Sequence, residues 1–177
     1  MLFSSVERGG PVRPAEDEEF REFMASRWPG LVRLGYGLTG DRGLAEDLAQ
    51  SALAKAYASW ARVRRADDPD AYVRRILINA NSNRFRKRRV SEHSAEQVPE
   101  TGVMDAADSF DQRSVLIAAL MELPPRQRAV VVLRYWEDLS EAQVASIMGC
   151  SVGTVKSQAS RALARLRTSA QLVEGIV

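Results

Sequence analysis

The sequence contains almost none of the residues that build metal centres and disulfides. Its 177 residues include one cysteine, Cys150, and one histidine, His93. A single thiol cannot form an internal disulfide, and two such residues cannot supply the four ligands of a structural zinc site. We therefore expect no disulfide framework, no metal centre and no cofactor.

Long hydrophobic runs are also missing. The longest apolar stretches, such as residues 129–133, are far shorter than the roughly 20 residues that cross a bilayer. The amino-terminal segment carries acids in place of the basic and apolar parts of a signal peptide. We expect a cytoplasmic protein.

Lysine is scarce, because 22 of the 25 basic residues are arginines. Arginine is favoured on surfaces that bind phosphate, although a GC-rich genome gives the same bias. The net charge is only +2, but it hides a strong segregation: residues 84–89 are densely basic, whereas residues 16–19 and 92–111 are acidic. Positive and negative charges are thus concentrated in different segments of the chain.

The first half of the chain has the periodicity of a small helical domain. Residues 1–14 contain glycine and proline without apolar spacing and are predicted to be a disordered tail. Helical spacing then begins, and Pro29 with Gly30 predicts a kink or break. Asp41 is a candidate N-cap for a second helix to about residue 61, and Pro69 suits the start of a third helix to about residue 89. The apolar positions that recur at helical spacing in this segment are Phe20, Phe23, Met24, Trp28, Leu31, Leu34 and Leu38.

The best domain boundary lies between residues 90 and 109. This segment is polar and acidic, contains Pro99 and Gly102, and lacks amphipathic spacing, so it predicts a flexible linker. No segment alternates as a strand does. The expected fold is all-α, with two small helical domains at residues 15–89 and 110–177.

The second domain ends in a helix-turn-helix pattern. A helix over residues 126–138 is expected after Pro124 and Pro125, while Ser140 and Gln143 form a capping box for a short helix. Gly149 suits the left-handed turn that follows, and Ser151 is a candidate N-cap for a last helix over residues 152–166. The polar face expected on that helix is Thr154, Lys156, Ser157, Gln158, Ser160 and Arg161. Such a face fits phosphates and base edges in a major groove, although an ordinary helical hairpin also leaves a solvated polar face.

Two further surfaces carry weaker signals. The helix over residues 69–89 interleaves amides, aromatics and arginines, including Asn81 and Phe85. Rings and guanidinium planes can stack on unpaired bases, but cations at a helix end also simply oppose the helix dipole. The second helix carries Glu46, Asp47 and Gln50, and acids in a first turn usually do no more than complement that dipole.

Three segments together resemble a known family. They are LTGDRGLAEDLAQSALAKAY at residues 38–57, DPDAYVRRILINANSNRFRKRR at residues 68–89, and ELPPRQRAVVVLRYWEDLSEAQVASIMGCSVGTVKSQASRALARLR at residues 122–167. In this order they resemble the extracytoplasmic-function (ECF) sigma factors of the sigma-70 family, and the words RYWEDLS and GTVKS resemble the actinobacterial SigE-family group. The resemblance covers nearly everything from Phe20 to Arg167.

The resemblance implies a sigma factor without enzymatic activity, which binds core RNA polymerase through its beta-prime and beta subunits and opens promoter DNA. Sigma region 2 would occupy residues 15–89 and sigma region 4 residues 110–177. The contacts to core polymerase implied in this way are Glu46, Asp47 and Gln50. The contacts implied to the minus-ten element, on the melted non-template strand, are Tyr72, Arg75, Asn79, Asn83 and Arg84. Those implied to the duplex minus-thirty-five element are Arg126, Arg128, Thr154, Lys156, Ser157, Ser160 and Arg161, of which the first two would hold phosphates.

Departures from the family limit what can be carried over. Many relatives have a tryptophan in place of Tyr72 and a bulky residue in place of Ser160, so no promoter sequence is inferred. The acidic linker would pass toward the polymerase cleft. A separate anti-sigma factor is a possible partner, because many relatives are held inactive by one.

Three other readings stay open. A helix-turn-helix repressor would need a ligand pocket or a dimerising apolar face in its first domain. An enzyme would recruit carboxylates such as Asp67, Asp68 and Asp70, or Glu46 and Asp47, but no histidine, nucleophile or glycine-rich phosphate loop supports them. An adaptor or antagonist that mimics a sigma factor fits the motifs better. Promoter binding that depends on core polymerase would separate a sigma factor from all three.

Overall fold

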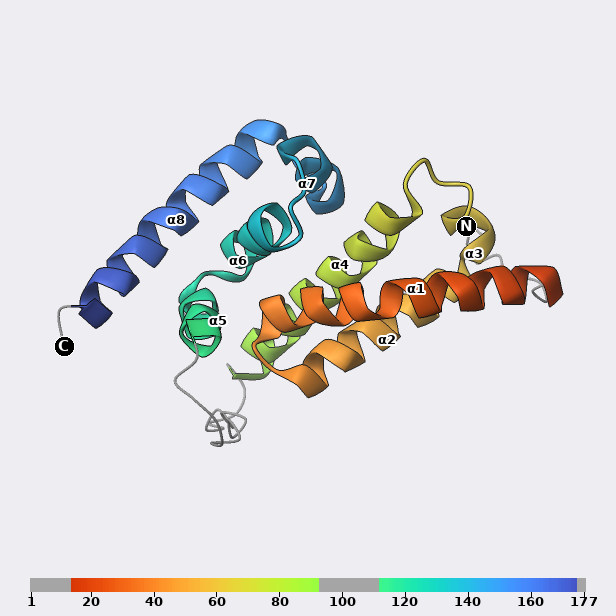
Figure 1. Cartoon of the computed structure of the whole chain (residues 1–177), viewed down its shortest axis with the longest axis horizontal. Coiled ribbons are helices and arrows are strands. Elements are labelled where there is room, and N and C mark those ends of the chain that lie inside the picture. Colours follow the sequence, from red (N-terminus) through yellow and green to blue (C-terminus); the bar gives the residue numbers. More distant parts are fainter. Residues whose placement is uncertain (1–13, 93–111, 175–177) are drawn as a thin grey trace, which may run out of the picture.

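The computed structural model describes residues 14–92 and 112–174, and within them every regular element is a helix (Figure 1). The elements are α1 (Pro14–Thr39), α2 (Arg42–Ala58), α3 (Trp60–Val63), α4 (Pro69–Glu92), α5 (Gln112–Glu122), α6 (Pro125–Val131), the π-helical η1 (Val132–Trp136), α7 (Glu141–Met148) and α8 (Val152–Glu174). The all-α expectation is confirmed. The predicted tail and most of the predicted linker lie outside the described residues.

The first helix runs without interruption through Pro29, so the expected break is wrong. Proline removes one backbone hydrogen bond and crowds the carbonyl four residues earlier. Here both Pro29 and Ala25 are exposed, so water can satisfy the carbonyl that proline leaves unpaired. A break is therefore unnecessary.

Side-chain caps set the starts of the next long helices. Oδ1 of Asp41 accepts a hydrogen bond from the backbone N–H of Leu44 at 2.7 Å, and Oδ1 of Asp68 accepts one from the N–H of Ala71 at 2.9 Å. Both caps agree with the sequence pattern. The second helix ends earlier than expected, at Ala58, and Trp60 begins the one-turn α3.

The core of the amino-terminal domain lies where α1 crosses α2 and α4. Leu34 and Leu38 of α1 are fully buried, as is Leu77 of α4. Trp60 closes one end of this core, because its ring packs edge-on against Phe20 with ring centroids 5.1 Å apart. Met24 and Trp28, two of the apolar positions at helical spacing, are each 37% exposed.

The helix expected over residues 126–138 changes type halfway. From Val132 it becomes a π-helix, in which the N–H of Glu137 donates to the carbonyl of Val132 at 3.0 Å, five residues back. Asp138 then adopts a φ of +52°, an uncommon value for a residue other than glycine. This wider turn changes the direction in which Glu137 points.

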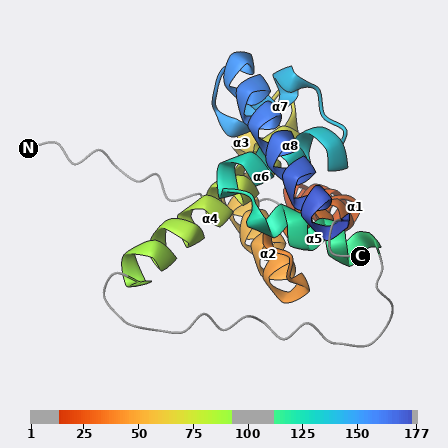
Figure 2. The same cartoon turned by 90° about the vertical axis from the view of Figure 1, so that its left-hand side faces the viewer.

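The two helical domains pack against each other. Buried apolar residues of both domains form one continuous cluster, in which Leu38 of α1 belongs with Leu120 of α5 and Leu133 of η1. In Figure 1 α4 lies between the α1–α2 pair and the α6–α7 pair, and in Figure 2 α5 and α6 lie against α1 and α4. The relative position of the domains is thus fixed by side-chain packing.

Candidate nucleic-acid interface

Local hydrogen bonds hold the helix-turn-helix in shape. Oγ of Ser140 accepts from the backbone N–H of Gln143 at 3.2 Å, and Oε1 of Gln143 accepts from the N–H of Ser140 at 2.8 Å. Gly149 has a φ of +62°, as a left-handed cap requires. Oγ of Ser151 accepts from the N–H of Thr154 at 3.1 Å and begins α8. The predicted capping box, turn and cap are all confirmed.

One face of α8 is buried and the opposite face is exposed. Val155, Ala159 and Ala162 pack into the hydrophobic cluster at helical spacing. The exposed polar residues between them are Lys156, Ser157, Ser160 and Arg161. We call these four residues the α8 reading face.

Several residues of this surface already have partners within the domain, and Oγ of Ser157 donates to the carbonyl of Thr154 at 3.0 Å. The hydroxyl of Thr154 lies 2.9 Å from that of Ser151, and its half-buried side chain belongs to the cap. Nζ of Lys156 is 3.6 Å from Oε2 of Glu141 on α7. Because both of these charged side chains are partly exposed, the pair is weak and Lys156 can exchange its partner for a phosphate.

Arg126 and Arg128 have opposite environments. Arg126 is exposed and available to a phosphate, but Arg128 is only 6% exposed. Its guanidinium donates to the carbonyl oxygens of Leu120, Met121 and Leu123 at 2.8, 2.8 and 3.0 Å. In this structure the guanidinium of Arg128 is occupied by these carbonyls and is not available to a phosphate.

The candidate strand-binding residues lie along α4. Arg75, Asn79, Asn83 and Arg84 are exposed, and Tyr72 is half-buried. We call these five residues the α4 strand face. Asn81 does not belong to it, because its side chain turns into the core with 4% exposure. Helical periodicity thus selects only some of the amides and arginines seen in the sequence.

The candidate core-polymerase contacts lie on the outer side of α2. Asp47 and Gln50 are exposed, whereas Glu46 is half-buried and accepts from Nε of Arg42 at 3.1 Å. Gln50 also lines a groove of about 460 Å³ between α1 and α2. The exposed apolar side chains of this groove are Met24, Trp28 and Tyr57. Sequence reasoning missed this apolar part, because helical spacing alone does not show which apolar residues of α1 stay exposed.

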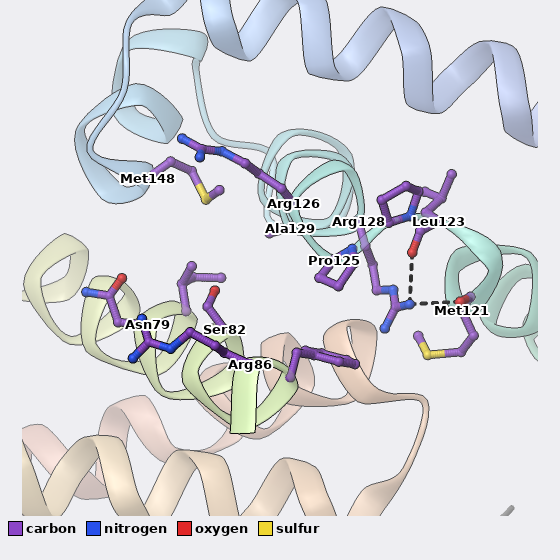
Figure 3. A pocket seen from close by; sticks show the side chains of 13 residues that line it. Asn79, Ser82, Arg86, Met121, Leu123, Pro125, Arg126, Arg128, Ala129 and Met148 are labelled. Carbon is purple, nitrogen blue, oxygen red and sulfur yellow. Dashed lines mark hydrogen bonds between the residues drawn. The ribbon is translucent and has the colours of Figure 1, made fainter. Parts of the chain in front are cut away.

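A larger cavity of about 1260 Å³ opens between α4 and α6 (Figure 3). Ile78, Leu123 and Ala129 form its apolar walls, while Arg86 and Arg126 add positive charge from the two sides. Asn79 of the α4 strand face and Met148 of α7 also line it. The α4 strand face and the helix-turn-helix therefore meet in one cleft.

The described residues hold no group of three or more histidine, cysteine or acidic side chains close enough to bind a metal ion. No helix among the same residues is long and apolar enough to cross a membrane. What the described surface offers instead is hydrogen-bonding and cationic side chains on two helices, α4 and α8. Such a surface suits the phosphates and bases of nucleic acid.

These features define a helix-turn-helix protein with an additional helical domain, and family models agree with that class. Residues 25–90 match Sigma-70 region 2, and residues 113–166 match Sigma-70 region 4. The chain is 42% identical over 149 residues to the RNA polymerase sigma-E factor of Streptomyces coelicolor, with 84% of each chain covered. It is 32% identical over 147 residues to the ECF RNA polymerase sigma factor SigL of Mycobacterium tuberculosis, with 80% of this chain and 82% of SigL covered. The chain therefore belongs to the ECF sigma factors of the sigma-70 family.

Solved structures agree with this assignment. The sigma factor RpoE from Bartonella quintana, crystallised with the anti-sigma factor NepR, matches with a TM-score of 0.73 at 27% identity, covering 87% of this chain and 98% of RpoE. CnrH, solved with the cytosolic domain of CnrY, matches with a TM-score of 0.62 at 20% identity, covering 88% and 90% of the two chains. The second likeness concerns the fold alone.

Proposed function

We propose that this chain is a dissociable specificity subunit of RNA polymerase, which binds the core enzyme and directs promoter-specific initiation without catalysing a reaction itself. The α8 reading face carries the proposal, because its four polar residues are exposed while the opposite side of the same helix is buried in a capped helix-turn-helix. In region 4, residues 113–166, these side chains and Thr154 would contact the minus-thirty-five element. Arg126 would hold a phosphate beside it.

Region 2, residues 25–90, supplies the other two contacts in this proposal. The α4 strand face would bind the non-template strand of the melted minus-ten element, since an aromatic ring, amides and guanidinium groups suit unpaired bases. Glu46, Asp47 and Gln50 would bind the beta-prime subunit of core polymerase. The neighbouring groove with Met24, Trp28 and Tyr57 supports this assignment, because protein interfaces commonly join an apolar centre to a polar rim.

The proposal extends to partners and place of action. A separate anti-sigma factor would be a regulator, since the structurally similar sigma factor RpoE binds the anti-sigma factor NepR. The chain would act in the cytoplasm, on the nucleoid when bound to polymerase. The domain limits 15–89 and 110–177 and the linker 90–109 belong to the same proposal.

In vitro transcription tests the proposal directly. The purified chain, core RNA polymerase from a GC-rich bacterium and fragmented genomic DNA of the source organism are combined, and transcript starts are sequenced. We expect starts that require the chain and share two upstream motifs at a fixed spacing. Core binding without any starts would reject this function in favour of an antagonist that mimics a sigma factor.

A further inference from the structure

Glu137 of region 4 lies in the contact between the two regions, and both of its cationic partners belong to region 2. Oε1 of Glu137 is 3.0 Å from Nη2 of Arg33 on α1, and Oε2 is 3.4 Å from Nη2 of Arg74 on α4. The Glu137 side chain is only 2% exposed. Removing a carboxylate from water costs free energy, and the two arginines offset that cost. We call this triad of residues the Glu137 latch.

The backbone that carries Glu137 is irregular. The π-turn from Val132 places Glu137 after a widened turn, and Asp138 follows in the left-handed region. π-turns are rare and often occur at functional sites, and a non-glycine residue with positive φ needs its surroundings to hold it. The irregular turn directs the acid toward Arg33 and Arg74.

Gly37 lies where α1 closely approaches the π-turn, near the same contact. A Cβ atom at Gly37 would lie 2.9 Å from Cγ1 of Val132 and 3.3 Å from Cγ2. Val132 is fully buried, so its short branched side chain has no free space to move into. Only glycine lets α1 and the π-turn approach this closely.

In the closed packing, α7 lies beside part of the α4 strand face. α7 packs directly on α4, and a Cβ atom at Gly149 would lie 3.6 Å from Nη2 of Arg75. Asn79 and Met148 line the same cleft from the two regions (Figure 3). A single strand running along α4 over the exposed Arg75 and Asn79 would therefore have to pass between α4 and α7, where the packing of α7 narrows its path.

We propose that this packing is an autoinhibitory contact, in which the helix-turn-helix of region 4 blocks part of the α4 strand face until the Glu137 latch opens. The inference rests on the proposed function of α4. The α8 reading face stays exposed in the closed chain, so the block falls on strand capture and not on duplex contact. Opening the latch also releases the guanidinium of Arg74 from its carboxylate partner.

Two substitutions open the latch by different physical routes. Glu137→Gln keeps the shape of the side chain and removes its charge, which leaves Arg33 and Arg74 without an anion. Gly37→Ala wedges α1 away from Val132. The matched control is Gly30→Ala, since Gly30 lies in the same helix and a Cβ atom there would meet nothing within 4 Å.

The closure is measured as a distance between two spin labels on the full-length chain. One label is placed at Asp67→Cys, in the exposed loop before α4, and the other at Arg165→Cys, on the exposed side of α8, in a Cys150→Ser background. We expect one narrow distance in the parent chain and in Gly30→Ala, and longer, broader distances in Glu137→Gln and Gly37→Ala. Equal distances in all four chains would overturn the latch.

Transcription by the same variants, unlabelled and at limiting concentration with excess core polymerase, tests inhibition. Glu137→Gln and Gly37→Ala should each raise the initial rate by about threefold, because more of the chain is competent to capture the strand. Opening without a higher rate would overturn the inhibitory role. If no chain yields transcripts, the proposed function itself fails and the inhibitory role with it, while the distances still decide whether Glu137 closes the chain.

Discussion

Arg128 donates a hydrogen bond from Nη1 to the carbonyl oxygen of Leu38 at 2.8 Å, across 90 residues of sequence. Its other three acceptors are carbonyls at the end of α5 and in the turn after it, and its guanidinium also lies over the ring of Phe85 on α4, 5.7 Å from the centroid. Burial lowers the pKa of Arg128 from its usual value, yet a guanidinium stays charged at neutral pH. One buried cation thus joins α1, α4, α5 and α6.

Replacing Arg128 should destabilise the whole chain. Arg128→Ala leaves several buried carbonyls without a donor, and we expect a loss of about 3 kcal/mol in the free energy of unfolding. Urea unfolding followed by circular dichroism measures it. Arg126→Ala, two residues away and exposed, is the control and should cost less than about 0.5 kcal/mol. Equal costs for the two variants would show that the carbonyl bonds of Arg128 contribute little.

The capping box should contribute measurably to the stability of the helix-turn-helix. Ser140→Ala removes the acceptor for the N–H of Gln143, and such N-caps contribute about 1 kcal/mol. Ser146→Ala, on the exposed side of the same helix, keeps the cap and serves as control. Thermal unfolding of the two variants gives the difference. A cap that matters only locally would leave the transition midpoint unchanged in both.

Tyr57 should titrate above its ordinary pKa of 10.0. Its hydroxyl donates to Oδ1 of Asp17 at 2.6 Å, and this hydrogen bond to a carboxylate raises the pKa of Tyr57. The contact therefore stabilises the fold below pH 10, and that stabilisation is lost as pH rises through the higher folded-state pKa.

Absorbance of the tyrosinate ion follows this titration, and the difference between the parent chain and Tyr57→Phe isolates the signal. Asp17→Asn should move the pKa of Tyr57 back toward 10.0, because the negative charge that opposes ionisation is gone. An unchanged titration in Asp17→Asn would assign the shift to another neighbour.

Core binding and promoter binding should separate between two residues. Arg161→Ala should weaken promoter-dependent initiation by roughly tenfold, about 1–3 kcal/mol, without changing affinity for core polymerase. Asp47→Ala should weaken the affinity for core polymerase more than it weakens initiation at saturating core. Titrations of labelled chain with core, followed by transcription at saturating core, distinguish the two effects. The reverse pattern would refute the residue assignments on α2 and α8.

Local features of the fold were predictable from the sequence because they depend on neighbours along the chain. Asp41 caps α2 through a bond to Leu44, and Ser140 with Gln143 builds its box within four residues. Gly149 ends α7 through its own left-handed backbone conformation, which the glycine itself indicates. The resemblance to ECF sigma factors likewise rested on contiguous motifs and is confirmed by the family matches.

What the sequence did not predict depends on contacts between distant segments. Nothing in the sequence around Arg128 distinguishes it from a surface arginine, and its burial is explained by carbonyls at the end of α5 together with that of Leu38 in the other domain. The π-turn is likewise coupled to Glu137 meeting Arg33 and Arg74. No local spacing encodes such pairs. The residue assignments for polymerase and promoter contacts stay predictions.

Gly37 has opposite effects on the stability of α1 and on the packing of α1 against Val132. Glycine inside a helix costs about 1 kcal/mol relative to alanine, so α1 on its own would be the more stable with alanine at this position. This position is locally frustrated, because alanine favours the helix but its Cβ would clash with Val132. A methyl group at position 37 would therefore stabilise α1 and at the same time weaken the contact between the two regions.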